Sequence, residues 1–124
     1  MREPKPALGP DLVQLVAEID APKLHQLVLN LVRNACEAVG QGGRVSVRVH
    51  QQDAYVHIVV QDNGPGIPDD VRARIYEPFF STKEGGTGLG MSIVHSLVSL
   101  HHGGIDLTTG RGGTTFDVRL PRWR

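Results

Sequence analysis

Between Lys23 and Val39, apolar residues recur at helical spacing, and this stretch restricts the possible folds more than any other part of the sequence. Leucine, valine and alanine return every three or four residues, which places them on one face of a helix. Asp20 is suited to an N-cap, Pro22 to a first turn, and Gly40 to the end of the helix. Since an apolar helix face must be buried against a second element, the chain needs at least two layers.

Strand and hairpin patterns supply that second layer. Residues 71–75 and 91–100 have helical patterns, and two hairpin-like pairs of segments surround them. Hairpins and helices in this order predict an α/β fold, a two-layer sandwich in which helices cover one face of a mixed, mostly antiparallel sheet. The four segments with strand composition are 45–49, 55–60, 105–108 and 115–120.

Length and charge limit the class of protein. The chain has 124 residues, enough for one domain, and we expect a proline-rich tail or linker over 1–11 and a single domain over 12–124. Thirteen basic and thirteen acidic residues cancel, which argues against nucleic acid and anionic membranes as partners. The single cysteine, Cys36, allows no internal disulfide and fits a cytoplasmic location. We expect Cys36 to be a packed side chain rather than a nucleophile.

The segment from Asp62 to Pro68 follows a strand pattern and contains two glycines and two prolines. Its Asn-Gly and Pro-Gly dipeptides are typical of turns, and a simple turn explains the segment taken alone. The functional alternative is a backbone that approaches a planar ligand closely, with Asp62 accepting a hydrogen bond from an exocyclic amine.

A second glycine-rich segment, residues 85–90, leads directly into the helix expected from Met91. Backbone N–H groups at a helix N-terminus attract anions such as phosphate, while a flexible loop is the alternative. The segment is neither a dinucleotide fingerprint nor a P-loop, because its spacing differs and the chain has no Gly-Lys dipeptide.

Polar side chains also lie on the first predicted helix. Asn30, Asn34 and Glu37 are spaced so that they share one face. Two interpretations fit such residues. They could form hydrogen bonds between the helix and a loop, or an amide oxygen among them could bind Mg²⁺.

In their order along the chain, these segments resemble the catalytic, ATP-binding domain of sensor histidine kinases, and in particular the nitrogen-regulation type. The resemblance implies the histidine kinase ATPase-like fold and an ATP-binding catalytic domain over 12–124, shortened at its N-terminus relative to the family. The motifs that carry the resemblance are an asparagine box (29–38), a first glycine box (62–68), a phenylalanine box (76–83), a second glycine box (85–90) and a closing strand (112–121).

The resemblance implies a role for individual residues. Asn30 and Asn34 would be catalytic, with Asn34 as the Mg²⁺ ligand and Asn30 helping to place the ATP phosphates. Asp62 would bind the adenine amine, and Thr114 would support adenine through a water. The phenylalanine box would form part of a mobile lid over the nucleotide. Further nucleotide-binding residues implied by the family are Gly64, Gly66, Ile67, Lys83, Gly86, Thr87, Gly88, Leu89 and Gly90.

The resemblance further implies a protein histidine kinase that transfers the γ-phosphoryl group of ATP to a histidine on a separate dimerisation domain. A response regulator would be reached through the full-length protein, without nucleic acid or direct membrane contact. None of the six histidines precedes an acidic residue, as the acceptor in this family commonly does. We therefore expect the chain to bind ATP but not to phosphorylate itself efficiently.

Two other functions remain open at this point. One is an anti-sigma-factor-type serine kinase, although the phenylalanine box of that group is generally less well formed than the one here. The other is a non-catalytic module that binds nucleotide only to signal. Autonomous ATP hydrolysis is disfavoured, because Asn30 stands where gyrase-type ATPases carry a glutamate base, and asparagine cannot accept a proton at neutral pH.

Overall fold

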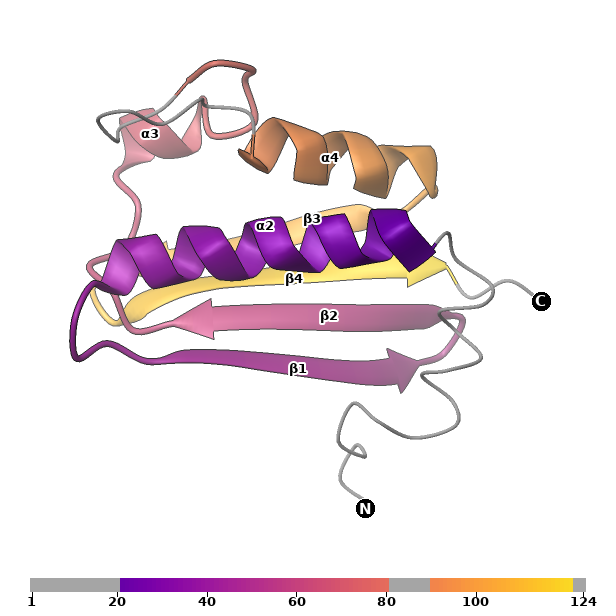
Figure 1. Ribbon diagram of the computed structural model, residues 1–124, viewed down its shortest axis with the longest axis horizontal. Helices are drawn as coiled ribbons and strands as arrows, with labels where there is room; N and C mark the ends of the chain where they lie inside the picture. The colour runs from indigo at the N-terminus through magenta and orange to yellow at the C-terminus, as the bar shows by residue number, and fades with distance from the viewer. Residues whose placement is uncertain (1–20, 81–89, 122–124) are drawn as a thin grey trace.

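The computed structural model describes residues 21–80 and 90–121, and all structural statements below concern these residues. Helices α2 and α4 lie on the same face of the sheet, and the short helix α3 lies at one end of it (Figure 1). The helices are α2 (Ala21–Val39), α3 (Asp69–Arg72) and α4 (Gly90–Leu100), and the strands are β1 (Val45–Gln52), β2 (Tyr55–Asp62), β3 (Gly104–Gly110) and β4 (Gly113–Pro121).

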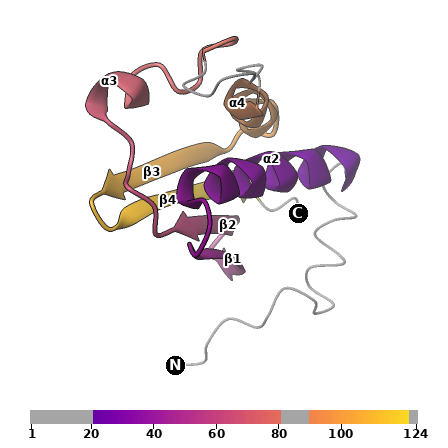
Figure 2. The same cartoon turned by 60° about the vertical axis from the view of Figure 1, so that its left-hand side comes forward.

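The sheet has the strand order β1-β2-β4-β3, and all three neighbouring pairs are antiparallel. The predicted two-layer α/β sandwich with helices on one face is therefore confirmed, and Figure 2 shows both helices on the same side of the sheet. β2 and β4 are the central strands, although α4 and β3 separate them along the chain. This pairing places the end of β2 beside the start of β4.

Helix α2 forms where the periodicity predicts it. Gly40 ends the helix with a φ of +64°, a left-handed conformation that glycine adopts without strain, and its N–H donates to the Cys36 carbonyl at 3.3 Å. The expected N-cap at Asp20 lies outside the described residues. The expectation that Cys36 is packed is wrong, because its side chain is exposed. Cys36 follows the buried Ala35, and one helical step of about 100° turns it away from the sheet.

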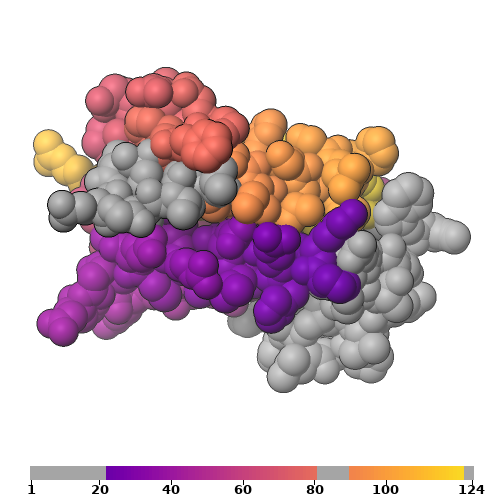
Figure 3. All heavy atoms as spheres, turned by 45° about the horizontal axis from the view of Figure 1, so that its top comes forward, coloured from indigo at the N-terminus to yellow at the C-terminus, as the bar shows by residue number. Residues whose placement is uncertain are grey.

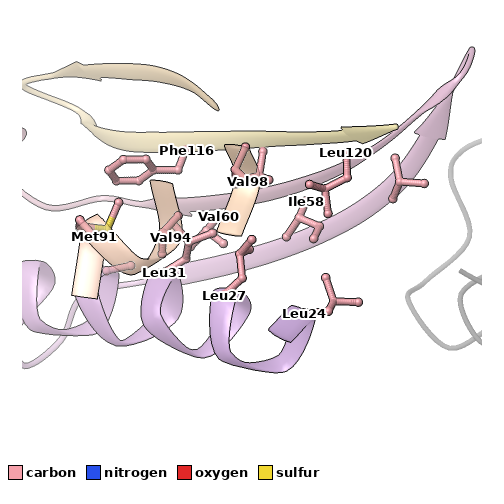
Figure 4. Close-up of a cluster of buried hydrophobic side chains, with 13 residues drawn as sticks. Leu24, Leu27, Leu31, Ile58, Val60, Met91, Val94, Val98, Phe116 and Leu120 are labelled. Atoms are coloured by element: carbon pink, nitrogen blue, oxygen red, sulfur yellow. The ribbon is translucent and has the colours of Figure 1, made fainter. Parts of the chain in front are cut away.

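The core lies between the helices and the two central strands. Alternate residues of β2 and β4 point toward the helices, and Val118 and Leu120 are almost fully buried. Figure 4 shows the leucines of α2 opposite Ile58 and Val60, with α4 completing the cluster. Each fully buried side chain of this size contributes about 1.5–3 kcal/mol. Leu100 lies in the predicted apolar helix 91–100 but is 57% exposed, because it is the last residue of α4.

The helix expected over 71–75 begins and ends earlier, at Asp69 and Arg72. Two aspartates in its first turn interact favourably with the helix dipole. Arg72 then donates from Nη2 to the carbonyl of Leu107 in the edge strand β3 at 2.7 Å. This bond attaches the α3 segment to the sheet. Within the described part of the chain, no helix combines the length and apolar character needed to cross a membrane.

Candidate functional site

The segments singled out in the sequence meet at one end of the sheet. The C-terminal part of α2, the end of β2, the start of β4, α3 and the first turn of α4 all lie there (Figure 1). α2 and α4 lie side by side, and the space-filling view in Figure 3 shows both helices on the same face of the molecule. The antiparallel pairing of β2 with β4 is what gathers segments that are far apart in sequence.

Asp62 lies at the centre of this end, as the last residue of β2. It pairs in register with Thr114, and both side chains are buried, with 6% and 5% of their surface exposed. The Gly64 N–H donates to Asp62 Oδ1 at 2.9 Å. Oδ2 makes no hydrogen bond with any described residue, so it is free to accept one from a ligand.

The two glycines of the first glycine box are required by contacts within the protein. Gly66 has a φ of +88°, and a Cβ at this position would overlap the carbonyl oxygen of Gly110. A Cβ on Gly64 would lie 3.1 Å from Asp62 Oδ1 and 3.2 Å from the Ala38 carbonyl oxygen. The loop is therefore held tightly between the end of α2 and the β3–β4 turn. The turn interpretation and the ligand interpretation are compatible here.

A chain of hydrogen bonds connects this loop to the central sheet. The N–H of Ile67 donates to Thr109 Oγ1 at 2.8 Å, and Thr109 Oγ1 lies 2.8 Å from Thr114 Oγ1. Thr109 is absent from the site residues predicted from the sequence. Its position in the hairpin could have indicated it, because Thr109 pairs with Thr114 directly across the Gly110–Gly113 turn.

Asn63 also helps to hold the loop in place. The Arg44 N–H donates to Asn63 Oδ1 at 2.8 Å, and the Asn63 N–H donates to the Arg44 carbonyl at 3.2 Å. These two bonds close the end of the β1–β2 pair immediately beside Asp62. The Asp62 side chain is therefore held by the Gly64 N–H, and the backbone next to it is held by the two bonds between Asn63 and Arg44.

The two asparagines of α2 lie one helical turn apart, and Asn30, midway along the helix, bonds to the other helix. Asn30 Nδ2 donates to the carbonyl oxygen of Gly90, the first residue of α4, at 3.4 Å. This long contact joins the asparagine box to the end of the second glycine box and leaves the Asn30 amide oxygen available. Asn34 takes part in interactions of its own.

Oxygen donors are the kind of ligand that Mg²⁺ prefers, and the asparagine side chains fit this requirement. Among the described residues there is no cluster of three or more histidine, cysteine or acidic side chains able to hold a metal.

Several predicted site residues lie outside the described residues, namely Lys83, Gly86, Thr87, Gly88 and Leu89. Gly90 is described, and it is the first residue of α4, one residue before the expected start at Met91. In the phenylalanine box, Phe79 is 77% exposed with a φ of +68°, and the Arg74 guanidinium lies 4.5 Å from the centre of the Phe80 ring.

Tyr76 begins the phenylalanine box and is packed against the core. Its ring lies 5.1 Å from the His95 ring of α4, measured between centroids. Burial raises the pKa of the Tyr76 hydroxyl, and the nearby positive charge of Arg72 partly opposes that rise. Tyr76 is thus a neutral packing residue that connects the phenylalanine box to α4.

Comparison with known proteins gives a consistent result. Residues 19–124 match the family described as histidine kinase-, DNA gyrase B-, and HSP90-like ATPase. The sensory histidine kinase/phosphatase NtrB of Klebsiella oxytoca is 38% identical over 132 residues, covering 90% of this chain and 38% of NtrB. The chain thus spans well under two thirds of the length of that relative.

Solved structures agree with this match. The catalytic domain of the histidine kinase ThkA has a TM-score of 0.77 and 34% identity, covering 84% of this chain and 69% of that one. Full-length ShkA in complex with AMPPNP has a TM-score of 0.71 and 35% identity, covering 80% of this chain and 21% of that one.

Proposed function

This chain belongs to the histidine kinase-, DNA gyrase B- and HSP90-like ATPase family, as a catalytic ATPase domain of two-component sensor histidine kinases, and we propose that it transfers the γ-phosphoryl group of ATP to a histidine on a separate dimerisation domain. One observation carries the proposal. The buried carboxylate of Asp62 keeps an oxygen free at the end of β2, directly opposite the buried Thr114.

Asp62 is the proposed recognition residue for the adenine base. Its Oδ2 accepts a hydrogen bond from the exocyclic amine, while Oδ1 stays bonded to the Gly64 N–H at 2.9 Å. Thr114 supports the base from the neighbouring strand, and the loop of Gly64, Gly66 and Ile67 lines the purine. Full-length ShkA, which shares this fold, was solved in complex with AMPPNP, an ATP analogue, and this supports a nucleotide as the ligand here.

Asn34 is the proposed Mg²⁺ ligand, and Asn30 places the phosphates beside it. Mg²⁺, when bound, neutralises the charge that develops on the phosphoryl oxygens. The protein's own contribution is to position the phosphates. Asn30 contacts the Gly90 carbonyl, so Asn30 lies at the N-terminus of α4. Backbone donors there attract phosphate oxygens. Phosphate contacts by residues 86–90 and Lys83 rest on the family resemblance.

The acceptor and the next partner belong to the full-length protein. We propose that the acceptor histidine lies on a dimerisation domain and that phosphoryl transfer continues to a response regulator. Because the domain needs ATP and the acceptor in one compartment, we place its action in the cytoplasm. NtrB is named a sensory histidine kinase/phosphatase, which supports a kinase as the full-length protein.

Calorimetric titration with ATP, with and without Mg²⁺, tests the nucleotide site. Asp62→Asn should weaken ATP binding by about tenfold or more, because an amide N–H₂ would face the adenine amine with a donor instead of an acceptor. Asp70→Asn, an exposed position on α3, is the matched control and should bind like wild type. Equal affinity of Asp62→Asn and wild type, with both shown to be folded by circular dichroism, would contradict the proposed site.

A further inference from the structure

The hydroxyl of Thr109 is not accounted for by the proposed roles, yet it lies at the centre of the site. Thr109 is half-buried in β3, and its hydroxyl accepts the Ile67 N–H at 2.8 Å and lies 2.8 Å from the hydroxyl of Thr114. Thr114 in turn pairs in register with Asp62. Ile67, Thr109 and Thr114 thus form a continuous line of polar groups that ends at the residue directly opposite Asp62 on the neighbouring strand.

The nature of the donor fixes the direction of the first hydrogen bond along this line, and polarisation favours one direction for the second. A backbone N–H can only donate, so Thr109 must be the acceptor in its bond with Ile67. A hydroxyl that accepts a hydrogen bond becomes a better donor, because successive bonds polarise one another. Either hydroxyl can be the donor in the bond between Thr109 and Thr114, and polarisation by Ile67 favours the arrangement in which Thr109 donates its one proton to Thr114. Thr114 is then an acceptor toward Thr109, and its own proton points away from Thr109.

We propose that Thr109 is a positioning residue for base recognition: it holds the Thr114 hydroxyl as a donor directed at N1 of adenine, directly or through one water. This inference rests on the proposed function, since it assumes that Asp62 binds the adenine amine. A bridging water preserves the direction, because it accepts from Thr114 and donates its own proton to N1.

The pair of Asp62 and Thr114 then matches the polarity of one base edge. Adenine has a donor, its amine, next to an acceptor, N1, and the site has an acceptor next to a donor. Guanine has the opposite pattern, with a carbonyl oxygen next to an N–H group, so its carbonyl oxygen would face the Asp62 carboxylate and, in the direct arrangement, its N–H would face the Thr114 hydroxyl proton. Sites built to satisfy particular polar groups discriminate strongly against ligands that leave them unpaired. Thr109 thereby helps to select ATP over GTP.

The test compares ATP with 1-deaza-ATP, which lacks the N1 acceptor and is otherwise the same shape. Wild type should bind ATP about five- to tenfold more tightly than 1-deaza-ATP, the effect of one hydrogen bond. In Thr109→Val, which keeps the shape but lacks the hydroxyl, the two affinities should lie within about twofold of each other. Thr109→Ser keeps a hydroxyl and should restore the wild-type ratio.

The ratio of the two affinities separates positioning from support of the fold. If Thr109 only held the loop through Ile67, Thr109→Val would weaken ATP and 1-deaza-ATP by the same factor and leave the ratio unchanged. That result, or a wild-type ratio near one, overturns the inference while leaving ATP binding and its loss in Asp62→Asn intact. If wild type binds no ATP, the proposed function fails, and the inference fails with it.

Discussion

Among single residues, Gly113 determines how closely β4 approaches the end of β2. Its φ is +132°, and a Cβ there would overlap the backbone carbonyl of Asp62. Glycine therefore allows the strand to start where Thr114 can face Asp62. The role of this glycine is to let two backbones meet beside the site, and it does not require contact with a ligand.

Gly113→Ala should lower the free energy of unfolding by at least about 2 kcal/mol, because the new methyl group meets backbone atoms and the φ is strained for alanine. Urea unfolding followed by circular dichroism measures this change. Gly112→Ala is the matched control, since no atom lies within 4 Å of its added Cβ, and it should stay within about 0.5 kcal/mol of wild type. Equal stabilities of the two variants would contradict the close approach.

Among the elements, α2 both packs against the sheet and carries the two asparagines of the proposed site. Its buried face packs on the sheet through Leu24, Leu27 and Leu31, while Asn30 and Asn34 lie toward the end where the other site residues are found. The packing of these leucines against the sheet therefore fixes where the asparagines lie on the neighbouring face of α2. Any shift of α2 on the sheet would move the asparagines relative to Asp62.

Leu31→Ala should destabilise the fold by about 2–5 kcal/mol, because Leu31 is completely buried and its truncation leaves a cavity. Leu29→Ala on the same helix removes the same atoms from a side chain that is 43% exposed, and should cost about 1 kcal/mol or less. Thermal and urea unfolding compare the two variants. A larger loss for Leu29→Ala would mean that the helix faces the sheet in a different rotation.

In the whole molecule, the distribution of histidines bears on what the domain can do alone. All six lie in the described part of the chain. His57 Nδ1 lies 2.8 Å from a carboxylate oxygen of Asp117, and His101 Nδ1 lies 2.8 Å from the Leu97 carbonyl oxygen. These contacts give structural roles to two of the histidines, and no histidine precedes an acidic residue in the sequence.

The isolated chain should therefore incorporate no stable label from γ-labelled ATP, whereas the dimerisation domain of the full-length protein should become labelled when the chain is added. Acid-labile, base-stable label identifies phosphohistidine, and Asp62→Asn is the control for dependence on the nucleotide site. Stable label at a histidine within this chain would show that the acceptor is present here after all.

Much of the fold could be predicted from the sequence because its signals are local. The periodicity from Lys23 to Val39 and the alternation in the strands depend only on neighbouring residues, and both elements appear with boundaries shifted by a few residues. Exposure was harder to predict. Cys36 and Leu100 lie in apolar surroundings in the sequence, but a helical step and a helix end turn them toward solvent.

The candidate site, too, could be predicted from the sequence only in part. The sequence by itself determined which residue types are present: Asp62 at a strand end, glycines that permit tight turns, and asparagines one helical turn apart. Only the tertiary structure decided that Asp62 faces Thr114 and that Thr109 connects Thr114 to the loop at Ile67. The physical reason is that these contacts join strands separated along the chain, and their register is set by packing of the whole sheet against α2 and α4.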